Sequence, residues 1–295
     1  MRKRAAFIAS FTTALAIFVA GGSSFGQDQV KKIRADYISP SPHYFQFFLA
    51  QEQGIMAEQR LDLELVKMDP GTGVLFAAKG QLDFATALTQ SYLAKSKGQP
   101  LEIVCTIVDK VDFAILTQQS IRTPADLKGK KVGISSTTSI LVLPLEKLLS
   151  GAGLSLNDVE LVPIKSSVQR VVQVMAGNLD ATVIDFANAI HALKRGYTVF
   201  ELFYDLPFIG VAVRKEDALQ LGSKLTAAFF QTMKFAREHP EETVALLKKW
   251  MPSPGLEDQD YRQIYERFLR MLTNNCVAST EAMDNLKRYL TTVAK

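Results

Sequence analysis

The sequence has few of the residues that carry metal and nucleophile chemistry. Its 295 residues include two cysteines, three histidines and one tryptophan. The histidines, His43, His191 and His239, form no metal-ligand pattern with cysteines or carboxylates. There is no Gly-x-Ser-x-Gly turn and no Cys–His arrangement typical of a nucleophile. We therefore expect a protein without a metal, a cofactor or a catalytic site.

An excess of charge of one sign is also missing. The net charge is +4 and the pI about 8.9, and three of the positive charges are Arg2, Lys3 and Arg4. Without those three the net charge is +1. Nucleic-acid binding needs basic residues clustered on one face or along one helix, and we find no such cluster. No nucleic-acid partner is expected.

The one long apolar run lies at the N-terminus. Residues 5–20 are mostly apolar, follow the basic residues 2–4, and precede the small residues 21–24. This order is typical of a secretory signal peptide. With Ser24-Phe25-Gly26 as the cleavage signal, we predict a signal peptide over residues 1–26, cleaved near Gly26, and export to the periplasm. The alternative is an uncleaved anchor, although a spanning helix needs about 20 apolar residues.

Export would place the two cysteines, Cys105 and Cys276, in an oxidising compartment. An oxidising compartment allows a disulfide between them. Cys105 lies in an apolar, strand-like run, so a small buried residue is the alternative. The sequence does not show whether the two side chains meet.

Strand-like runs alternate with helical stretches from residue 32 to residue 214. Separate strands are predicted at 32–38, 61–68, 82–86, 101–108, 113–117, 130–135, 159–163, 181–185, 199–203 and 209–214. This alternation favours an α/β protein with parallel strands. Four helical stretches follow after Lys215. The phrase KGQLDFA at 79–85 has a counterpart, AGNLDAT, at 176–182, and this repetition predicts two lobes of similar build.

Several phrases resemble a known family. The most specific is PADLKGKKVGIS at residues 124–135; the Gly-x-x-Asp junctions at 80–83 and 177–180 and the phrase LAQEQGI at 49–55 agree with it. Across residues 33–288 the chain resembles ABC-importer periplasmic solute-binding proteins of the nitrate, sulfonate, taurine and thiamine-pyrimidine-precursor binding type.

The resemblance implies a fold, a division into lobes and a function. The fold is a two-lobed α/β periplasmic-binding-protein-like fold (type II), with a ligand cleft between lobes and a helical C-terminal segment. Lobe 1 is expected to comprise residues 27–118 and 214–295, and lobe 2 residues 119–213. A protein of this type is a monomer that captures a small polar molecule and, by hinge closure, delivers it to an ABC permease in the inner membrane.

Polar loops after the predicted strands supply candidate binding groups. Ligands of open α/β sheets bind beyond the carboxyl ends of strands and at helix N-termini. The loops at 39–44, 69–73, 135–139 and 165–170 meet this description, and the run of hydroxyls at 135–139 is the strongest because it exceeds what one N-cap needs. Ordinary turns and caps are the alternatives. With the start of the next helix, these loops provide Ser39, Ser41, His43, Tyr44, Gly71, Thr72, Thr89, Ser135, Ser136, Thr137, Thr138, Ser166 and Ser167.

Three further residues complete the set. Asp185 ends an apolar strand and can accept hydrogen bonds from an amine or a heterocycle N–H; the alternative is a cap for the next helix. Phe208 can form an apolar wall of the cleft, or pack in the core. Arg170 could reach an anion, and its alternative is a solvated helix position.

The ligand cannot be carried over from the family. The only tryptophan, Trp250, lies in the C-terminal helices, and the candidate loops hold no cluster of Arg or Lys for a sulfonate or nitrate. A small polar ligand with an aromatic or amine part is the expectation. Two alternatives to importer delivery stay open: a periplasmic sensor partner, and a pyrimidine-precursor-synthase-like enzyme, although the cysteine-rich motif of those synthases is absent.

Overall fold

The computed structural model of the protein describes residues 29–137 and 139–293, so the predicted signal peptide and Thr138 lie outside the described residues. The strands are β1 (Lys31–Tyr37), β2 (Leu61–Lys67), β3 (Phe84–Ala87), β4 (Leu101–Thr117), β5 (Lys131–Ile134), β6 (Glu160–Pro163), β7 (Ala181–Asp185) and β8 (Thr198–Arg214). The helices are α1 (Phe45–Glu52), α2 (Ile55–Glu58), α3 (Pro70–Ala78), α4 (Leu88–Ser96), α5 (Val142–Gly151), α6 (Ser167–Met175), α7 (Phe186–Lys194), α8 (Ser223–Glu238), α9 (Pro240–Trp250), α10 (Asp258–Met271) and α11 (Thr280–Val293). Short helical turns are η1 (Pro42–Tyr44), η2 (Pro124–Leu127), η3 (Leu156–Asp158), η4 (Lys215–Asp217) and η5 (Ala218–Gly222).

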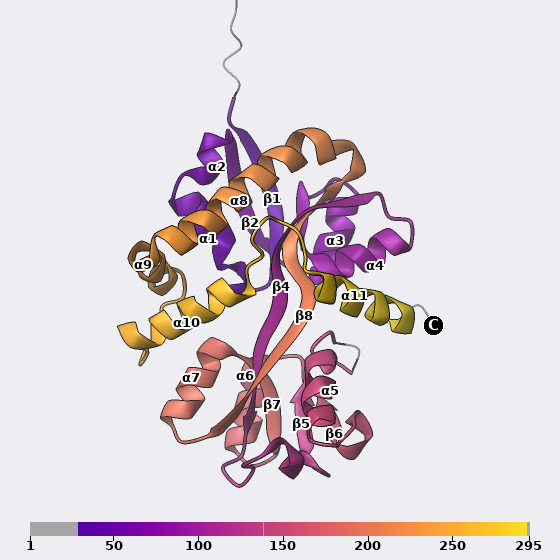
Figure 1. The fold of residues 1–295 in the computed structure, drawn as a ribbon, viewed down its shortest axis with the longest axis vertical. Coiled ribbons are helices and arrows are strands. Elements are labelled where there is room, and N and C mark those ends of the chain that lie inside the picture. Colours follow the sequence, from indigo (N-terminus) through magenta and orange to yellow (C-terminus); the bar gives the residue numbers. More distant parts are fainter. Residues whose placement is uncertain (1–28, 138, 294–295) are drawn as a thin grey trace, which may run out of the picture.

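Two long strands join the two halves of the molecule. Within the described residues the sheet has the order β2-β1-β3-β8-β4-β7-β5-β6. β4 and β8 have 17 residues each and pair antiparallel. At one end β8 pairs with β3, and at the other β4 pairs with β7. The result is two lobes connected through β4 and β8 (Figure 1), as the predicted fold class requires. The lobe boundaries at residues 118/119 and 213/214 stay predictions.

The prediction that each of these strands is two separate strands is wrong. Residues 109–112 and 204–208 contain polar residues and a proline, which interrupted the apolar pattern. In the structure they continue β4 and β8 across the junction, with register shifts between Thr106 and Val108 and between Val108 and Lys110. Bulges of this kind let a strand bend while its pairing continues.

The turn predicted at residues 70–73 is also different: these residues begin α3. The Asp69 side chain accepts hydrogen bonds from the backbone N–H groups of Gly71 (2.9 Å) and Thr72 (3.4 Å). Pro70 occupies the first helical position, where its missing N–H is not needed. The Asp69 cap therefore stabilises a helix at residues 70–73, although the glycines there favour a turn.

Aromatic packing fixes the C-terminal helices on lobe 1. Phe47 meets Phe229 of α8 edge to face at 5.0 Å between ring centroids, and Phe45 meets Phe268 of α10 at 5.2 Å. All four rings are fully buried. Edge-to-face pairs add to the free energy of apolar burial, so α8 and α10 pack firmly against α1. The predicted helical C-terminal segment is confirmed.

A disulfide between Cys105 and Cys276 ties the C-terminal segment to β4. The connection between α10 and α11 also runs along this strand through backbone bonds. Thr273 N–H donates to Ile107 O at 2.8 Å, and Thr106 N–H donates to Cys276 O at 2.8 Å. The Ser279 N–H donates to the Asp109 carboxylate at 2.9 Å. Of the two interpretations of Cys105, the disulfide is therefore the correct one, and it cross-links the first half of β4 to the C-terminal segment.

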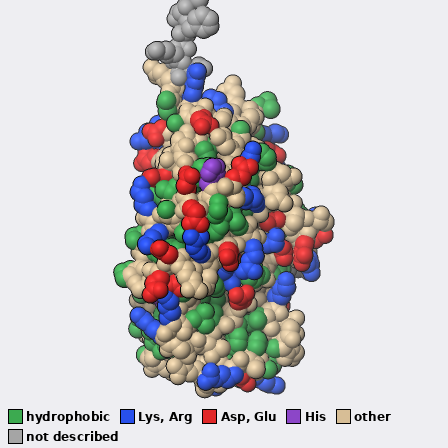
Figure 2. All heavy atoms as spheres, turned by 60° about the vertical axis from the view of Figure 1, so that its left-hand side comes forward, with side chains coloured by type: hydrophobic (Ala, Val, Ile, Leu, Met, Phe, Trp, Pro, Cys, Tyr) green, Lys and Arg blue, Asp and Glu red, His purple; other side chains and the backbone are tan. Residues whose placement is uncertain are grey.

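The surface carries charges of both signs. Figure 2 shows Lys and Arg side chains intermixed with Asp and Glu side chains over the face toward the viewer. In the described part of the chain, no helix combines the length and apolar character needed to cross a membrane.

Candidate ligand-binding site

The ends of strands from both lobes meet at Phe113 on β4. His43 follows β1, and its imidazole stacks on the Phe113 ring with 4.8 Å between centroids and 17° between planes. Asp185, the last residue of β7, is the backbone pairing partner of Phe113. Phe208 of β8 stands edge-on to the His43 ring at 5.3 Å and to the Phe113 ring at 6.2 Å. Three predicted site residues, His43, Asp185 and Phe208, are thus brought together.

His43 is the most unusual side chain of this group. It is 4% exposed, and its Nε2 atom has no hydrogen-bond partner. Burial lowers the pKa of His43 to about 4, against the opposing effects of the Asp185 carboxylate and the Asp112 backbone. The imidazole is therefore neutral at pH 7. A neutral ring with an unpaired buried nitrogen is a ready hydrogen-bonding group for a ligand or a water molecule.

Asp185 holds the start of α7 and also faces the junction. One carboxylate oxygen accepts from Asn188 N–H at 3.0 Å and the other from the Asn188 side-chain amide at 2.7 Å. The capping alternative is thus realised, but each carboxylate oxygen can accept more than one hydrogen bond. The side chain is half-buried, so capping and ligand contact are compatible.

Next to His43, Tyr44 belongs to a buried network that the sequence analysis missed. Asp36, near the end of β1, is fully buried, and its carboxylate accepts from Thr86 N–H at 2.8 Å and from the Thr86 hydroxyl at 3.1 Å. Burial raises the pKa of Asp36 to about 6. Burial also raises the pKa of the Tyr44 phenol, which shares a hydrogen bond with Thr86. The sequence held little signal for this, because β1 also carries Lys31, Lys32 and Arg34, and strand alternation places Asp36 on the same side as Arg34.

The remaining lobe 1 residues differ in their surroundings. The Thr89 hydroxyl is buried and donates to Pro207 O of β8 at 2.6 Å, which anchors the start of α4 to the connecting strand. Ser39 and Ser41 are half-buried, and the Ser41 side chain makes no capping hydrogen bond. Gly71 and Thr72 are exposed in the first turn of α3.

In lobe 2, the hydroxyl run precedes α5 rather than starting it. Ser135 and Ser136 are half-buried and Thr137 is exposed, and α5 begins at Val142. Thr138 lies outside the described residues. Ser166 and Ser167 are exposed, and the Ser166 hydroxyl accepts from Gln169 N–H at 3.3 Å as the cap of α6. The binding role of these residues stays a prediction.

Arg170 is neither an anion ligand nor a solvated helix residue. Its side chain is buried and donates to Ile164 O at 2.7 Å, to Val183 O at 3.3 Å and to the Thr182 hydroxyl at 3.1 Å. It therefore holds the loop after β6 against β7. Four of its five N–H donors are bonded to acceptors inside lobe 2.

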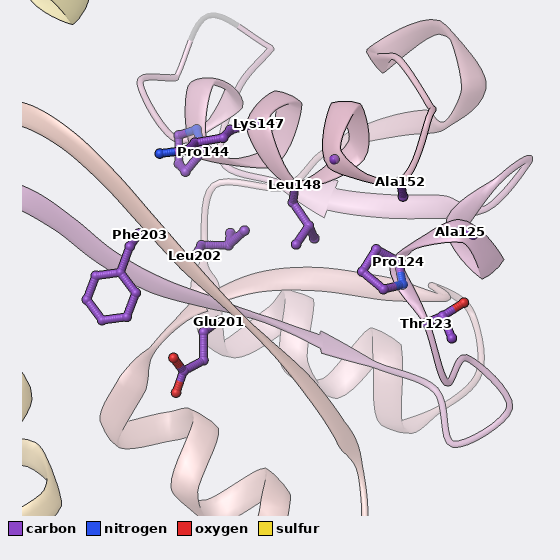
Figure 3. A pocket seen from close by; sticks show the side chains of 11 residues that line it. Thr123, Pro124, Ala125, Pro144, Lys147, Leu148, Ala152, Glu201, Leu202 and Phe203 are labelled. Atoms are coloured by element: carbon purple, nitrogen blue, oxygen red, sulfur yellow. The ribbon is translucent and has the colours of Figure 1, made fainter. Parts of the chain in front are cut away.

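Two hollows differ in their relation to this site. A groove of about 560 Å³ lies between α5, η2 and β8 on lobe 2, and none of the predicted site residues lines it. Figure 3 shows Leu148 and Leu202 pointing into it, while the Glu201 carboxylate points away. A cavity of about 10 Å³, the size of one water molecule, lies beside His43 and is bounded also by Asp112 and Arg267.

Metal-ligating side chains do not gather at the junction. Among the residues that the structure describes, no group of three or more His, Cys, Asp or Glu side chains could hold a metal ion. The candidate site at the junction thus consists of aromatic rings, a neutral imidazole and a carboxylate, groups that can bind a solute by hydrogen bonds and apolar contact.

The fold defines a class. The chain is similar to the periplasmic aliphatic sulphonate binding protein SsuA of Escherichia coli (TM-score 0.66, 19% identity, 89% of this chain and 86% of that one). It is also similar to the alkanesulfonate-binding protein SsuA of Xanthomonas axonopodis pv. citri bound to MOPS (TM-score 0.65, 17% identity, 90% and 92%). A Candida albicans gene product, CA3427, with the generic periplasmic binding protein structural fold, has a TM-score of 0.66 at 17% identity (90% and 90%). The protein therefore has the periplasmic-binding-protein fold.

Within that class the family is defined by sequence. The model of the family described as "NMT1/THI5 like" matches residues 41–243, and the chain belongs to this family. A putative thiamine biosynthesis protein of Haemophilus influenzae is 26% identical over 243 residues, which are 78% of this chain and 76% of that protein. The Saccharomyces cerevisiae 4-amino-5-hydroxymethyl-2-methylpyrimidine phosphate synthase THI5 is 29% identical over 99 residues, or 32% of this chain and 29% of the synthase. The resemblance and the fold class predicted from the sequence are confirmed.

Proposed function

We propose that the protein is a periplasmic solute-binding protein that captures a small molecule between its lobes and delivers it to an ABC importer in the inner membrane. The observation that carries this proposal is the meeting of His43 and Asp185, from opposite lobes, at Phe113 of the connecting strand. A solute bound there touches both lobes, so its binding energy favours their approach. The fold shared with periplasmic sulfonate-binding proteins supports both the role and the location.

The chemistry of the junction favours a neutral or cationic solute with hydrogen-bond donors and an apolar face. His43 is neutral and Asp185 offers carboxylate oxygens, while Phe113 and Phe208 supply ring surfaces. An anionic solute is bound most strongly where cationic side chains donate hydrogen bonds to it. The guanidinium groups of Arg170 and Arg267 are bonded to protein acceptors. Amines and planar heterocycles with N–H groups are therefore preferred over sulfonates and nitrate.

A melting-shift screen tests the proposal. A ligand that binds only the folded state raises the melting temperature. At a concentration 100 times Kd it increases the free energy of unfolding by about 2.7 kcal/mol. The screen comprises aminopyrimidines, aromatic and aliphatic amines, taurine, MOPS and nitrate. We expect stabilisation by a member of the first two groups. Absence of any stabilising compound, together with turnover of one of them by the purified protein, contradicts the binding function.

A pair of matched variants locates the site. Asp185→Asn keeps an N-cap residue for α7 but removes the negative charge. Asp158→Asn removes the same charge in lobe 2 at another carboxylate that binds a helix start, the third residue of η3, which accepts from the Ser155 N–H at 2.8 Å. The screen's best compound should bind about 10-fold or more weakly to Asp185→Asn, because hydrogen bonds to charged groups contribute about 1.5–3 kcal/mol, and equally well to Asp158→Asn. Equal loss in both variants removes Asp185 from the site.

One observation favours a second function, a pyrimidine-precursor synthase: the match to the yeast synthase THI5. That match spans 29% of the synthase, and both cysteines of this chain are used in the disulfide. Mass spectrometry of the protein and its medium after incubation with the compounds of the screen separates the two functions. A new product formed in proportion to the protein favours the synthase; recovery of the unchanged compound favours capture.

Delivery to a permease and presentation to a membrane sensor both require the solute to bind at this site. They differ in the partner that recognises the loaded protein. Uptake of the bound compound by membrane vesicles that contain a candidate ABC permease and its ATPase supports delivery. Binding to a membrane receptor without uptake supports the sensor role.

A further inference from the structure

A set of contacts between α7 of lobe 2 and the α9–α10 region of lobe 1 lies apart from the candidate site. At the end of α7, the Lys194 ammonium donates to Gly255 O at 3.1 Å and pairs with the Asp260 carboxylate. One turn earlier, His191 Nε2 lies 2.7 Å from the Ser253 hydroxyl. These contacts join helices of different lobes without using His43, Phe113 or Asp185.

The lobe 1 side of this contact is held by hydrogen bonds within lobe 1 itself. Ser253 N–H donates to the Tyr261 hydroxyl at 2.9 Å, and that hydroxyl donates to Met251 O at 2.8 Å. Tyr261 is 1% exposed. Asp260 also accepts from Glu257 N–H at 2.7 Å. A surface whose groups are already fixed loses little side-chain entropy when the opposite lobe docks on it.

Arg267 of α10 makes the central contact. Its guanidinium forms a two-pronged pair with the Asp112 carboxylate of β4, including a 2.8 Å bond, and both side chains are nearly fully buried. The same guanidinium donates to Glu201 at 2.5 Å and lies 3.6 Å from the centre of the Phe186 ring of α7. Arg267 therefore reaches from lobe 1 to a connecting strand and to the first residue of the lobe 2 helix.

We propose that the contacts of His191, Lys194 and Arg267 across the lobes form a latch, the α7–α10 latch, that stabilises the joined arrangement of the lobes independently of the bound solute. In a hinged binding protein the apparent affinity scales with the population of the binding-competent arrangement. His191 and Lys194 act on that population from outside the solute site, while Arg267 borders the small cavity beside His43. The latch goes beyond the proposed capture function, since it concerns the equilibrium between the lobes with no solute present.

Small-angle X-ray scattering of the ligand-free protein tests the latch. The variant Lys194→Met/Glu201→Gln removes two charged contacts between the lobes and leaves the buried Arg267–Asp112 pair intact. The Lys194 and Glu201 side chains that are changed are 40% and 56% exposed. Ion pairs that water reaches contribute modestly, so each change should lower the ratio of joined to separated lobes about two- to five-fold. The radius of gyration is expected to rise above that of the wild type.

The matched control is Lys248→Met. Lys248 pairs with Asp258 at 2.7 Å, also at the start of α10, but both residues belong to lobe 1. Its scattering curve should superimpose on that of the wild type. The single variant Lys194→Arg keeps a cation that can pair with Asp260, and it leaves Glu201 unchanged. Its scattering curve should match that of the wild type.

The result that overturns the latch is a scattering curve of the double variant identical to that of the wild type and of Lys248→Met. Equal expansion in the latch variant and the control also overturns it, since this indicates general loosening. Because the measurement uses no solute, failure of the latch and failure of the capture function are separate outcomes. Should the double variant not fold, Lys194→Met alone gives the same comparison, since this lysine is 40% exposed.

Discussion

His43, on the loop after β1, stacks on Phe113 of the connecting strand β4, with ring planes at 17°. Phe113 is also the backbone partner of Asp185 at the end of β7. One residue of the strand that joins the lobes therefore contacts a side chain from lobe 1 and pairs with the last residue of a lobe 2 strand. The contact of His43 with Phe113 thus joins the loop after β1 to the β4–β7 pair, which is why we propose solute capture there.

The buried His43 should make the protein less stable in acid. Its pKa in the folded protein is about 4, below the usual 6.5, because of burial. Between these values the unfolded chain binds more protons, so stability falls as the pH drops from about 6.5 to 4, by up to about 3 kcal/mol. In His43→Gln this part of the loss should disappear. Urea unfolding between pH 4 and pH 7 measures it, and parallel curves for both proteins contradict the prediction.

Asp36 should have the opposite effect over nearly the same range. Burial raises its pKa in the folded protein to about 6 from the usual 3.8. The folded state therefore binds more protons between pH 6 and 3.8, and this group contributes most stability in acid and loses it as the pH rises through 6. Asp36→Asn should remove a pH-dependent loss of up to about 3 kcal/mol. Its unfolding free energy relative to wild type should thus increase from pH 4 to pH 7; a constant difference is the contrary outcome.

Gly73 should not tolerate a side chain, because α3 lies against Asp36 at this point. A Cβ atom on Gly73 would lie 2.5 Å from the Asp36 Cγ. Gly73→Ala should destabilise the protein by about 1–3 kcal/mol through overpacking. Gly151→Ala is the control: it lies in α5 with no atom within 4 Å of the new Cβ, and alanine there should stabilise by about 0.5–1 kcal/mol. Thermal unfolding of both variants decides whether the close approach to Asp36 exists.

Reduction of the Cys105–Cys276 disulfide should weaken the folded state. The bond links residues 171 positions apart, and loss of a native disulfide typically costs about 2–5 kcal/mol. Urea unfolding with and without dithiothreitol measures the effect, and Cys105→Ala/Cys276→Ala should not respond to the reductant. Alkylation of both cysteines in the untreated, unfolded protein would show that the bond does not form.

The sequence predicted which candidate residues lie at the ends of strands, but it did not predict which residues they contact. The pattern of strands and helices located His43 and Asp185 at ends of strands, where ligands of α/β proteins bind. Phe113 looked like an ordinary strand residue, because its role depends on register with β7. Arg170 carried a local signal for a helix surface, and only the packing of α6 on β7 buried its guanidinium.

The continuity of β4 and β8 could not be foreseen for a similar reason. Asp109 and Asp112 interrupt the apolar pattern of β4, and this reads as a loop in the sequence. Both carboxylates are instead bonded by residues that are remote in the chain, Ser279 and Arg267. A polar residue in a strand is tolerated once a distant partner satisfies it.

The sequence by itself determined the α/β class, the helical C-terminal segment and the family, because hydrophobic periodicity, caps and family phrases are local properties of the chain. The loops proposed to bind a solute stay a prediction. The tertiary structure alone decided that Cys105 meets Cys276, that Asp36 and Arg170 are buried, and that His43 rests on Phe113. These features depend on which segments pack together, and burial of a charge or an imidazole changes its pKa and its hydrogen bonds only after the lobes have formed.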